Sequence, residues 1–350
     1  MKKVSLLKKI ALCTGALLCA TTMSARDIFV SANGSLSNPG TYDSPILFVQ
    51  GVADNANNGD RIIVLGEIKL EETINFTNKS ITITGNNALN KPNQESSASS
   101  LDGSDAGRIF NISGSGEVTI SNLTLKNAKN KAIEINGTDG ALTVNIGYCL
   151  IRNNSSLAPS QDGPDNGAGV CVTGGAVVNI FSCWFYENQA FRGGALFVAG
   201  SFVDVQYCDF ERNFTNAPLA EANSRGGAVA CAGAYTLEFN YCGFNGNYSR
   251  RGGGCIFEYG EGEFTVKNSY FINNHSGHDW FLEIVLDVNG EDIGSHSAPG
   301  DNHAGLLKTD GRSVITFINT TITKNAAYDD AIGGVAWIEG SASGEFNLIN

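Results

Sequence analysis

The sequence contains little of what helical, membrane-spanning or nucleic-acid-binding proteins need. Beyond residue 60 no segment shows the 3.6-residue apolar period of an amphipathic helix, which excludes a helical bundle. No apolar run reaches the roughly 18–20 residues of a membrane-spanning helix. The 23 basic residues are outnumbered by 35 acidic ones, so neither nucleic acid nor an anionic membrane is expected as a partner. Only 4 histidines and 7 prolines occur, whereas glycine, at 42 residues, is abundant.

A short motif recurs along the chain: an aromatic or aliphatic residue, two variable residues and an asparagine. Its asparagines are Asn154, Asn188, Asn213, Asn247, Asn274 and Asn325, and its aromatic positions are Phe185, Phe210, Phe244 and Phe271, with Ile151 and Ile322 in the flanking copies. Successive asparagines are 34, 25, 34, 27 and 51 residues apart. A base unit near 25 residues, lengthened by loops, is typical of a solenoid whose coils contact only their neighbours.

Each unit contains short segments in which apolar residues alternate, such as Val178 with Ile180 and Val203 with Val205. A period of two indicates β-strands. Units of this length that hold only short strands predict an all-β parallel β-helix.

Equivalent residues of adjacent coils then lie about 4.8 Å apart. We therefore expect the phenylalanines to form an internal stack and the asparagines to pass hydrogen bonds from coil to coil. A third column precedes each aromatic residue by two positions and consists of Cys149, Cys183, Cys208, Cys242, Ser269 and Thr320. Stacked Cβ vectors run parallel, so we expect mostly free, buried thiols rather than disulfides.

The chain divides into three predicted parts. Residues 1–25 hold four lysines, an apolar run and a small-residue end, as in a secretory signal peptide; its removal leaves 19 basic and 35 acidic residues, a net charge of −16. Residues 26–60 form an N-terminal cap, with a strand at 27–31 and a helix at 45–56 for which Asp43 or Ser44 is the N-cap. Residues 61–350 form the β-helix. The last strand lacks the rest of its coil, so we expect the sequence to be part of a longer protein.

Arginine precedes the glycine pair that follows the motif in three coils, at Arg192, Arg225 and Arg251. On consecutive coils these arginines would stack, and like charges so close need counter-anions. The neighbouring Glu187 and Glu211 could supply them, or an anionic glycan bound along the wall. The three arginines are therefore candidate ligand-binding residues.

All four histidines fall within residues 275–303, in the longest insertion. His275, His278, Asp279 and His303 are candidate metal ligands or general acids and bases, and a solvated loop is the alternative. Calcium could bind at Asp102 and Asp105 or at Asp162 and Asp165, although turn residues also explain these pairs. The sequence requires no cofactor.

Two resemblances follow from these motifs. The Gly-Gly-Ala-aliphatic segments at 193–196 and 226–229, with the Phe-x-x-Asn motifs, resemble repeats of the chlamydial polymorphic outer membrane protein family over roughly residues 150–340. Residues 28–41 resemble the opening of secreted proteins of the pectate-lyase-like superfamily. The resemblances imply a right-handed parallel β-helix, and for the first family a part in adhesion. The catalytic motifs of the lyase-like superfamily are missing, apart from the pair Asp329-Asp330.

We expect an exported protein, extracellular or on the outer cell surface, with an adhesin-like role. Its partner would be an extracellular glycan or a protein on a host or neighbouring cell. The alternative is a polysaccharide lyase or glycoside hydrolase that acts on an extracellular acidic polysaccharide. That alternative requires the arginines, or His275, His278 and nearby carboxylates, to converge in space.

Overall fold

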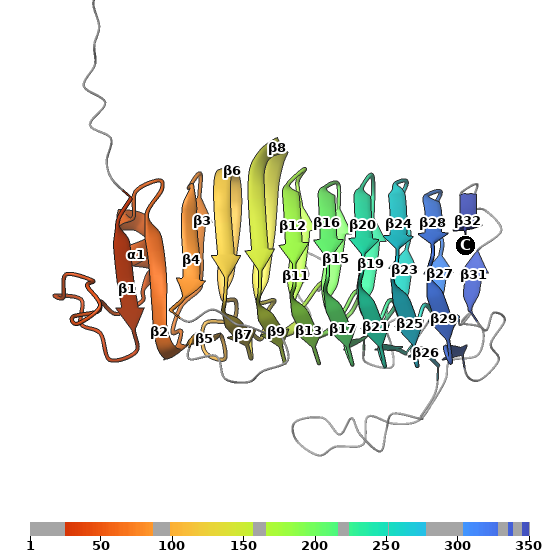
Figure 1. Cartoon of the computed structure of the whole chain (residues 1–350), viewed down its shortest axis with the longest axis horizontal. Coiled ribbons are helices and arrows are strands. Elements are labelled where there is room, and N and C mark those ends of the chain that lie inside the picture. The colour runs from red at the N-terminus through yellow and green to blue at the C-terminus, as the bar shows by residue number, and fades with distance from the viewer. Residues whose placement is uncertain are drawn as a thin grey trace, which may run out of the picture.

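The computed structural model of the chain describes residues 25–86, 99–156, 166–215, 224–250, 252–277, 304–327, 335–338 and 345–349. Its strands stack along the long axis of the molecule from β1 to β32 (Figure 1). Neighbouring coils pair in parallel, as Val178 with Val203 and Phe185 with Phe210 illustrate. The predicted parallel β-helix is confirmed.

Each regular coil has four short strands, and equivalent strands of successive coils form four walls. Wall 1 contains β11 (Val170–Thr173), β15 (Leu196–Ala199), β19 (Val229–Ala232), β23 (Ile256–Glu258), β27 (Leu307–Thr309) and β31 (Ala336–Ile338). Wall 2 contains β12 (Val177–Phe181), β16 (Phe202–Gln206), β20 (Thr236–Asn240), β24 (Glu263–Lys267), β28 (Val314–Ile318) and β32 (Glu345–Ile349). Wall 3 contains β9 (Leu150–Arg152), β13 (Trp184–Tyr186), β17 (Asp209–Glu211), β21 (Gly243–Asn245), β25 (Tyr270–Ile272) and β29 (Thr321–Thr323).

Wall 4 is a separate narrow sheet. It contains β10 (Ser155–Ser156), β14 (Gln189–Ala190), β18 (Phe214–Thr215), β22 (Tyr248–Ser249), β26 (His275–Ser276) and β30 (Ala326–Ala327).

The N-terminal coils are less regular. They comprise β1 (Asp27–Ser31), β2 (Arg61–Lys69), β3 (Ile74–Thr77), β4 (Ile81–Gly85), β5 (Ser99–Asp102), β6 (Phe110–Ser121), β7 (Thr124–Lys126) and β8 (Ile133–Gly147). The long strand β8 pairs with both β11 and β12, so it runs through wall 1 into wall 2.

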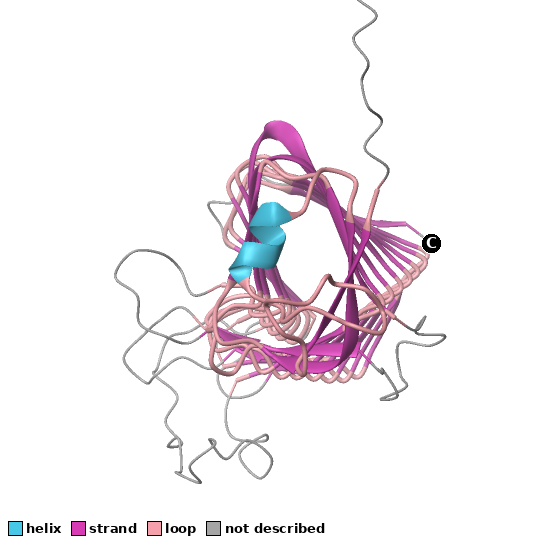
Figure 2. Ribbon diagram, turned by 90° about the vertical axis from the view of Figure 1, so that its left-hand side faces the viewer, coloured by secondary structure: helices cyan, strands magenta, loops and turns pink. Residues whose placement is uncertain are grey.

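The helix of the N-terminal cap is shorter than the sequence suggested. Helix α1 covers only Gln50–Asn55 and follows Val49, so Asp43 and Ser44 do not start it. Residue Ile46 instead hydrogen-bonds through its backbone to Phe29 and Ser31 of β1, which holds this segment extended. The helix lies at the N-terminal end of the stack (Figure 2) and buries Val52 and Ala53. Among the described residues, no helix is long and apolar enough to cross a membrane.

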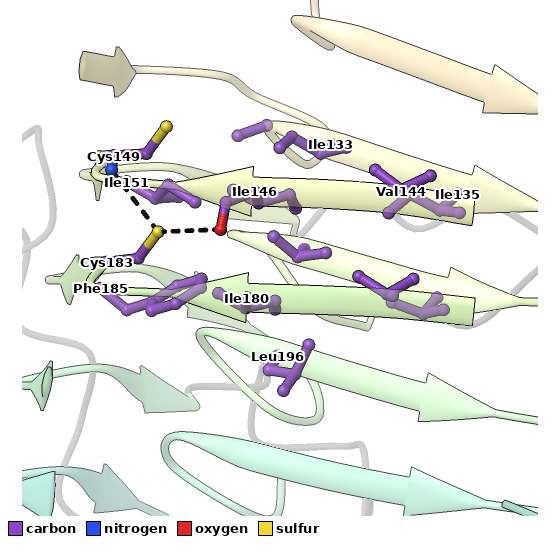
Figure 3. Close-up of a cluster of buried hydrophobic side chains, with 14 of the residues drawn as sticks. Ile133, Ile135, Val144, Ile146, Cys149, Ile151, Ile180, Cys183, Phe185 and Leu196 are labelled. Carbon is purple, nitrogen blue, oxygen red and sulfur yellow. Dashed lines mark hydrogen bonds between the residues drawn. The ribbon is translucent and has the colours of Figure 1, made fainter. Parts of the chain in front are cut away.

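The interior is a continuous apolar core. The rings of Phe185, Phe210, Phe244 and Phe271 stack with centroid separations of 4.7, 4.8 and 4.4 Å. Columns of Ile and Val from walls 1 and 2 fill the space beside the stack (Figure 3). The structure thus places the four phenylalanines as the sequence suggested.

The asparagines form a buried hydrogen-bonded ladder at the corner between walls 3 and 4. Each side-chain amide donates to the Oδ1 of the next asparagine toward the C-terminus, at 2.8–3.1 Å from Asn154 through to Asn325. Each Nδ2 also donates to a carbonyl of the preceding coil, as Asn213 does to Phe185 at 2.9 Å. The ladder therefore provides hydrogen-bond partners for asparagine side chains and backbone carbonyls of neighbouring coils.

Four cysteines, Cys149, Cys183, Cys208 and Cys242, lie at the corner between walls 2 and 3. The backbone N–H of Cys149 donates to the Sγ of Cys183 at 3.5 Å, and this sulfur donates to the carbonyl of Ile146 at 3.6 Å (Figure 3). The seven cysteines within the described ranges are all buried and free.

Candidate functional site

In four coils the chain between wall 4 and wall 1 is lengthened by residues that lie outside the described ranges. In chain order, residues 157–165, 216–223, 278–303 and 328–334 each follow a strand of wall 4 and precede a strand of wall 1. Long insertions of a solenoid are where binding sites concentrate. We therefore expect a binding site on the outer surface of wall 1, which begins where these insertions end.

Most of the outward-facing column of wall 1 is buried instead of solvated. In register it contains Glu134, Cys171, Phe197, Ala230, Phe257 and Lys308. Within it Cys171, Phe197, Ala230 and Phe257 form an apolar cluster that is separate from the interior core. The solenoid therefore has a second, smaller core on its outside.

The glycine turns cover this outer cluster. Gly193 and Gly226 have φ of +59° and +70°, and a Cβ on them would lie 2.6 and 2.8 Å from the backbone nitrogens of Ala230 and Phe257. A side chain at either glycine would therefore collide with the next coil. This close approach explains why each glycine pair follows the motif.

The arginines before these glycines lie on the outer face of wall 1. The backbones of Arg192 and Arg225 form a parallel bridge, which places them on adjacent coils. The Arg192 guanidinium lies 4.7 Å from the ring centroid of Tyr259, and its Nη1 donates to the Tyr259 hydroxyl at 3.0 Å. The Arg225 guanidinium lies 5.0 Å from the ring of Phe257. The third predicted member, Arg251, lies outside the described residues.

The counter-anions differ from those predicted. Arg225 pairs with Asp310 at 2.6 Å, whereas Glu187 pairs with Arg212 on wall 3 at 3.1 Å. The counter-anions differ because each arginine side chain extends toward the C-terminal end of the stack instead of along its own coil. Its partner therefore lies 67 or 85 residues further along the chain.

Positive charge predominates among the described residues of this surface, which we call the arginine face. Its described charged residues are the cations Arg108, Lys131, Arg192, Arg225 and Lys308 and the carboxylates Glu134 and Asp310. Glu134 binds Arg108 at 2.9 Å and Lys131 at 3.4 Å, and Asp310 lies 3.5 Å from Lys308. Among these described residues five cations outnumber two carboxylates, whereas the whole chain has a net charge of −12.

An unpaired amide lies in the same column of turns. Asn166 bridges Arg192 through its backbone and is fully buried. Its Oδ1 and Nδ2 have no hydrogen-bond partner among the residues that the structure describes. A buried polar group without a partner is unusual and costs free energy. The packing of this turn therefore does not explain why an asparagine occupies position 166.

One acidic side chain of wall 1 points the other way, into the interior. Glu258 is fully buried and accepts hydrogen bonds from the hydroxyls of Thr309 and Ser313, each at 2.6 Å, and from the backbone N–H of Gly260. These three donors stabilise the carboxylate inside the coil. It cannot meet a ligand on the outer surface without unfolding the wall.

The histidine and acidic candidates are only partly described. His275 lies half-buried on β26 in wall 4, where burial lowers its pKa, while His278, Asp279 and His303 lie outside the described residues. Within the described ranges no group of three or more His, Cys, Asp or Glu side chains comes together to hold a metal ion.

The calcium candidate near Asp102 is a hydrogen-bonded turn. Asp102 accepts from the backbone N–H of Ser104 at 2.9 Å and from the Asn127 amide at 2.7 Å, and Asp105 pairs with Lys69 at 2.8 Å. Asp162 and Asp165 lie outside the described residues.

Sequence reasoning missed a row of exposed aromatic side chains at the corner between walls 2 and 3. Tyr148, Phe181, Tyr207 and Tyr241 lie on four consecutive coils, with ring centroids 5.4, 5.4 and 5.2 Å apart. We call them the aromatic row. The repeated dipeptide Tyr-Cys at 148–149, 207–208 and 241–242 could have predicted three of the four rings. Only the cysteine of each dipeptide was included in the predicted columns.

Wall 3 carries one carboxyl group in an apolar setting next to this row. Asp209 accepts a hydrogen bond from the Tyr270 hydroxyl at 3.3 Å. Gly243 lies between these two residues in register, and because it has no side chain the Tyr270 ring can extend over it. Burial raises the pKa of Asp209 above its usual range. A single carboxyl group of this kind can donate a proton, but no second carboxylate is paired with it in these contacts.

A match to a family model supports the architecture. A family model described as "Right handed beta helix region" matches residues 108–283. The chain is similar to the solved structure of pectate lyase Pel9A (16% identity, TM-score 0.47, 89% of this chain and 80% of that chain). It is also similar to a rhamnogalacturonan lyase (12% identity, TM-score 0.44, 92% and 89% of the two chains). A comparison with curated proteins finds no match. The match to the family model covers half of the sequence and confirms the predicted handedness, so the chain belongs to the right-handed β-helix family.

Proposed function

We propose that this protein is an exported β-helix that binds an acidic extracellular glycan on the arginine face without cleaving it. The observation that carries the proposal is the distribution of charge, since the described residues of this surface comprise five cations and two carboxylates on an otherwise acidic chain. A positive surface on a negative protein attracts a polyanion to that surface and away from the others.

The arginines are held in place for this task. Rings of Tyr259 and Phe257 support the two guanidinium planes, which reduces the side-chain entropy that a ligand must remove on binding. A guanidinium group is planar and binds carboxylate groups through two parallel N–H donors. Because Arg192 and Arg225 lie on adjacent coils, successive carboxylates of one polymer could be bound together.

Binding is better supported than cleavage. Glu134 and Asp310, the carboxylates on the face, are each paired with two cations, and Glu258 points inward. A general base must be within hydrogen-bond reach of the proton that it removes, and these groups are already engaged. Cleavage of an acidic polysaccharide by a lyase or hydrolase is the alternative, with Asp209 as the described carboxyl group whose pKa best suits a proton donor.

An adhesin-like role follows if the glycan belongs to a host or neighbouring cell. Export rests on the predicted signal peptide at residues 1–25. Surface display would let the long wall contact a polymer over several coils.

Affinity electrophoresis in gels that contain polygalacturonate tests the proposal. We expect the wild type to be retarded and the double variant Arg192→Gln with Arg225→Gln to migrate as in an empty gel. Arg212→Gln is a matched control, because Arg212 also contacts a ring, that of Tyr186, and a carboxylate, that of Glu187, but lies on wall 3. Equal retardation of wild type and double variant, or equal loss in the Arg212 variant, would dismiss the arginine face as the site.

A further inference from the structure

The aromatic row has an unusual exposure. Its four side chains, Tyr148, Phe181, Tyr207 and Tyr241, are 43%, 38%, 50% and 53% exposed, while the inward phenylalanines of the same coils are fully buried. Scattered surface aromatics are common, but four in contact on four consecutive coils form a continuous apolar strip. Strips of this kind on a protein surface mark interaction sites.

The backbone under the row is unfavourable for tyrosine. One corner residue of each coil has a left-handed conformation, with φ between 49° and 55°, at Asn122, Tyr148, Ser182, Tyr207, Tyr241, Asn268 and Asn319. Asparagine adopts this conformation readily, whereas a bulky side chain there costs free energy. The coils before and after the row use asparagine. Tyrosine therefore occupies three positions where stability alone favours asparagine, and strain of this kind gathers at functional sites.

The row is also kept continuous where a tyrosine is missing. The corner residue of the second coil is Ser182, and in that coil the neighbouring position at the end of β12 is Phe181. The residues paired with Phe181 in the adjacent coils are Gly147 and Gln206. The phenylalanine thus fills the gap between Tyr148 and Tyr207, and each of the four coils presents one ring.

The surroundings of the row indicate what it binds. Along wall 2 its register neighbours Gly147, Gln206 and Asn240 carry no charge. Along wall 3 the corresponding positions are Leu150, Trp184, Asp209 and Gly243. These flanking positions hold no cation to attract an acidic polymer, and the amides can hydrogen-bond to hydroxyl groups.

We propose that the aromatic row is a second binding surface, which takes an uncharged glycan chain lying parallel to the solenoid axis. Sugar rings have an apolar C–H face that packs on aromatic side chains, and hydroxyl edges that accept and donate hydrogen bonds to amides and phenols. The spacing of the aromatic rings, 5.2–5.4 Å, is comparable to the length of one sugar residue in an extended chain. Successive sugars would therefore meet successive rings. This site lies on a different corner from the arginine face and does not depend on it.

The flanking coils show that asparagine fits the corner position that the tyrosines occupy, and this allows a test that does not disturb the fold. The triple variant Tyr148→Asn, Tyr207→Asn, Tyr241→Asn copies Asn122, Asn268 and Asn319. We expect its melting temperature to equal or exceed that of the wild type, since left-handed strain is relieved. Its affinity for hydroxyethylcellulose, a neutral glucan, should fall at least tenfold in affinity electrophoresis. Retardation by polygalacturonate should not change, which separates this surface from the arginine face.

Phe202→Thr is the matched control. Phe202 is 58% exposed on β16 but lies outside the row, and its neighbour in the next coil is Thr236. This variant should bind the neutral glucan like the wild type.

Failure of the wild type to bind the neutral glucan would overturn the proposal. So would unchanged binding by the triple variant, or a lower melting temperature with unchanged binding, which would make the row structural. A wild-type dimer in sedimentation that the triple variant abolishes, without glucan binding, would assign the row to a second copy of the chain instead.

Discussion

Nη1 of Arg192 donates to the hydroxyl of Tyr259 at 3.0 Å, although 67 residues separate them in sequence. The contact spans two coils, because Arg192 precedes β15 while Tyr259 follows β23. Contacts of this kind fasten the glycine turns to the outer surface of wall 1. These contacts hold the guanidinium groups of Arg192 and Arg225 against rings of wall 1 in the absence of a ligand.

Replacing Phe210 by Ala should destabilise the fold strongly. The ring is fully buried and stacks on Phe185 and Phe244, and truncation of a buried phenylalanine costs about 3–5 kcal/mol. Urea denaturation followed by circular dichroism would show a lower midpoint. Phe202→Ala, which removes an exposed ring, should leave the midpoint nearly unchanged, and equal effects of the two variants would refute the internal stack.

Asn213→Ala should break the asparagine ladder. It removes the oxygen that accepts from the backbone and side chain of Asn188, at 3.1 and 2.9 Å, and the donor to Asn247 and Phe185. A buried polar group left without a partner costs about 1–3 kcal/mol. Asn179→Ala, which breaks an exposed amide bond to Asn145, should change stability by no more than about 0.5 kcal/mol. Similar urea midpoints for the two variants would contradict a structural ladder.

Asp209→Asn should stabilise the protein at neutral pH. Burial raises the pKa of this carboxyl group in the folded state, so the ionised form is more costly in the folded than in the unfolded chain. This penalty is present above the folded pKa and disappears as the pH falls below the unfolded value of 3.8. The melting temperatures of variant and wild type should therefore differ at pH 7 and converge in acid. Asp43→Asn, at an exposed position, provides the control. A constant difference across the pH range would exclude this explanation.

The buried thiols should be unreactive in the folded protein. Burial raises the pKa of Cys171 to about 12 and raises those of Cys231 and Cys255 as well, and the thiolate is the reactive form. With protein that starts at Arg26, Ellman's reagent at pH 8 should detect almost no thiol before denaturation and seven afterwards. Rapid labelling of the native protein, or fewer thiols after denaturation, would be inconsistent with this packing.

The interior was predictable because a solenoid repeats its packing. The motif places Phe210 and Asn213 at the same point of every coil, and a parallel stack brings such positions together without further information. The handedness and the existence of an N-terminal helix were also predicted, but the helix was drawn too long. Its first five predicted residues include Ile46, whose backbone pairs with β1, a tertiary contact that helix propensity does not reveal.

The outer surface was harder to predict because its partners come from other coils. Arg225 pairs with Asp310 instead of Glu211. The repeat pattern does not indicate in which direction along the stack an outward side chain extends. The aromatic row escaped notice because Phe181 lies one residue away from the corner that Tyr148 and Tyr207 occupy. At the repeat position itself the sequence shows three tyrosines interrupted by Ser182.

Isothermal titration of the protein with oligogalacturonate, with the same samples assayed for new reducing ends and unsaturated products, tests directly whether the arginine face binds an acidic glycan without cleaving it. We expect saturable binding by the wild type and by Arg212→Gln, at least tenfold weaker binding by the Arg192→Gln, Arg225→Gln variant, and no product in any sample. Wild-type binding that the double variant retains in full, or release of cleavage products, would contradict it.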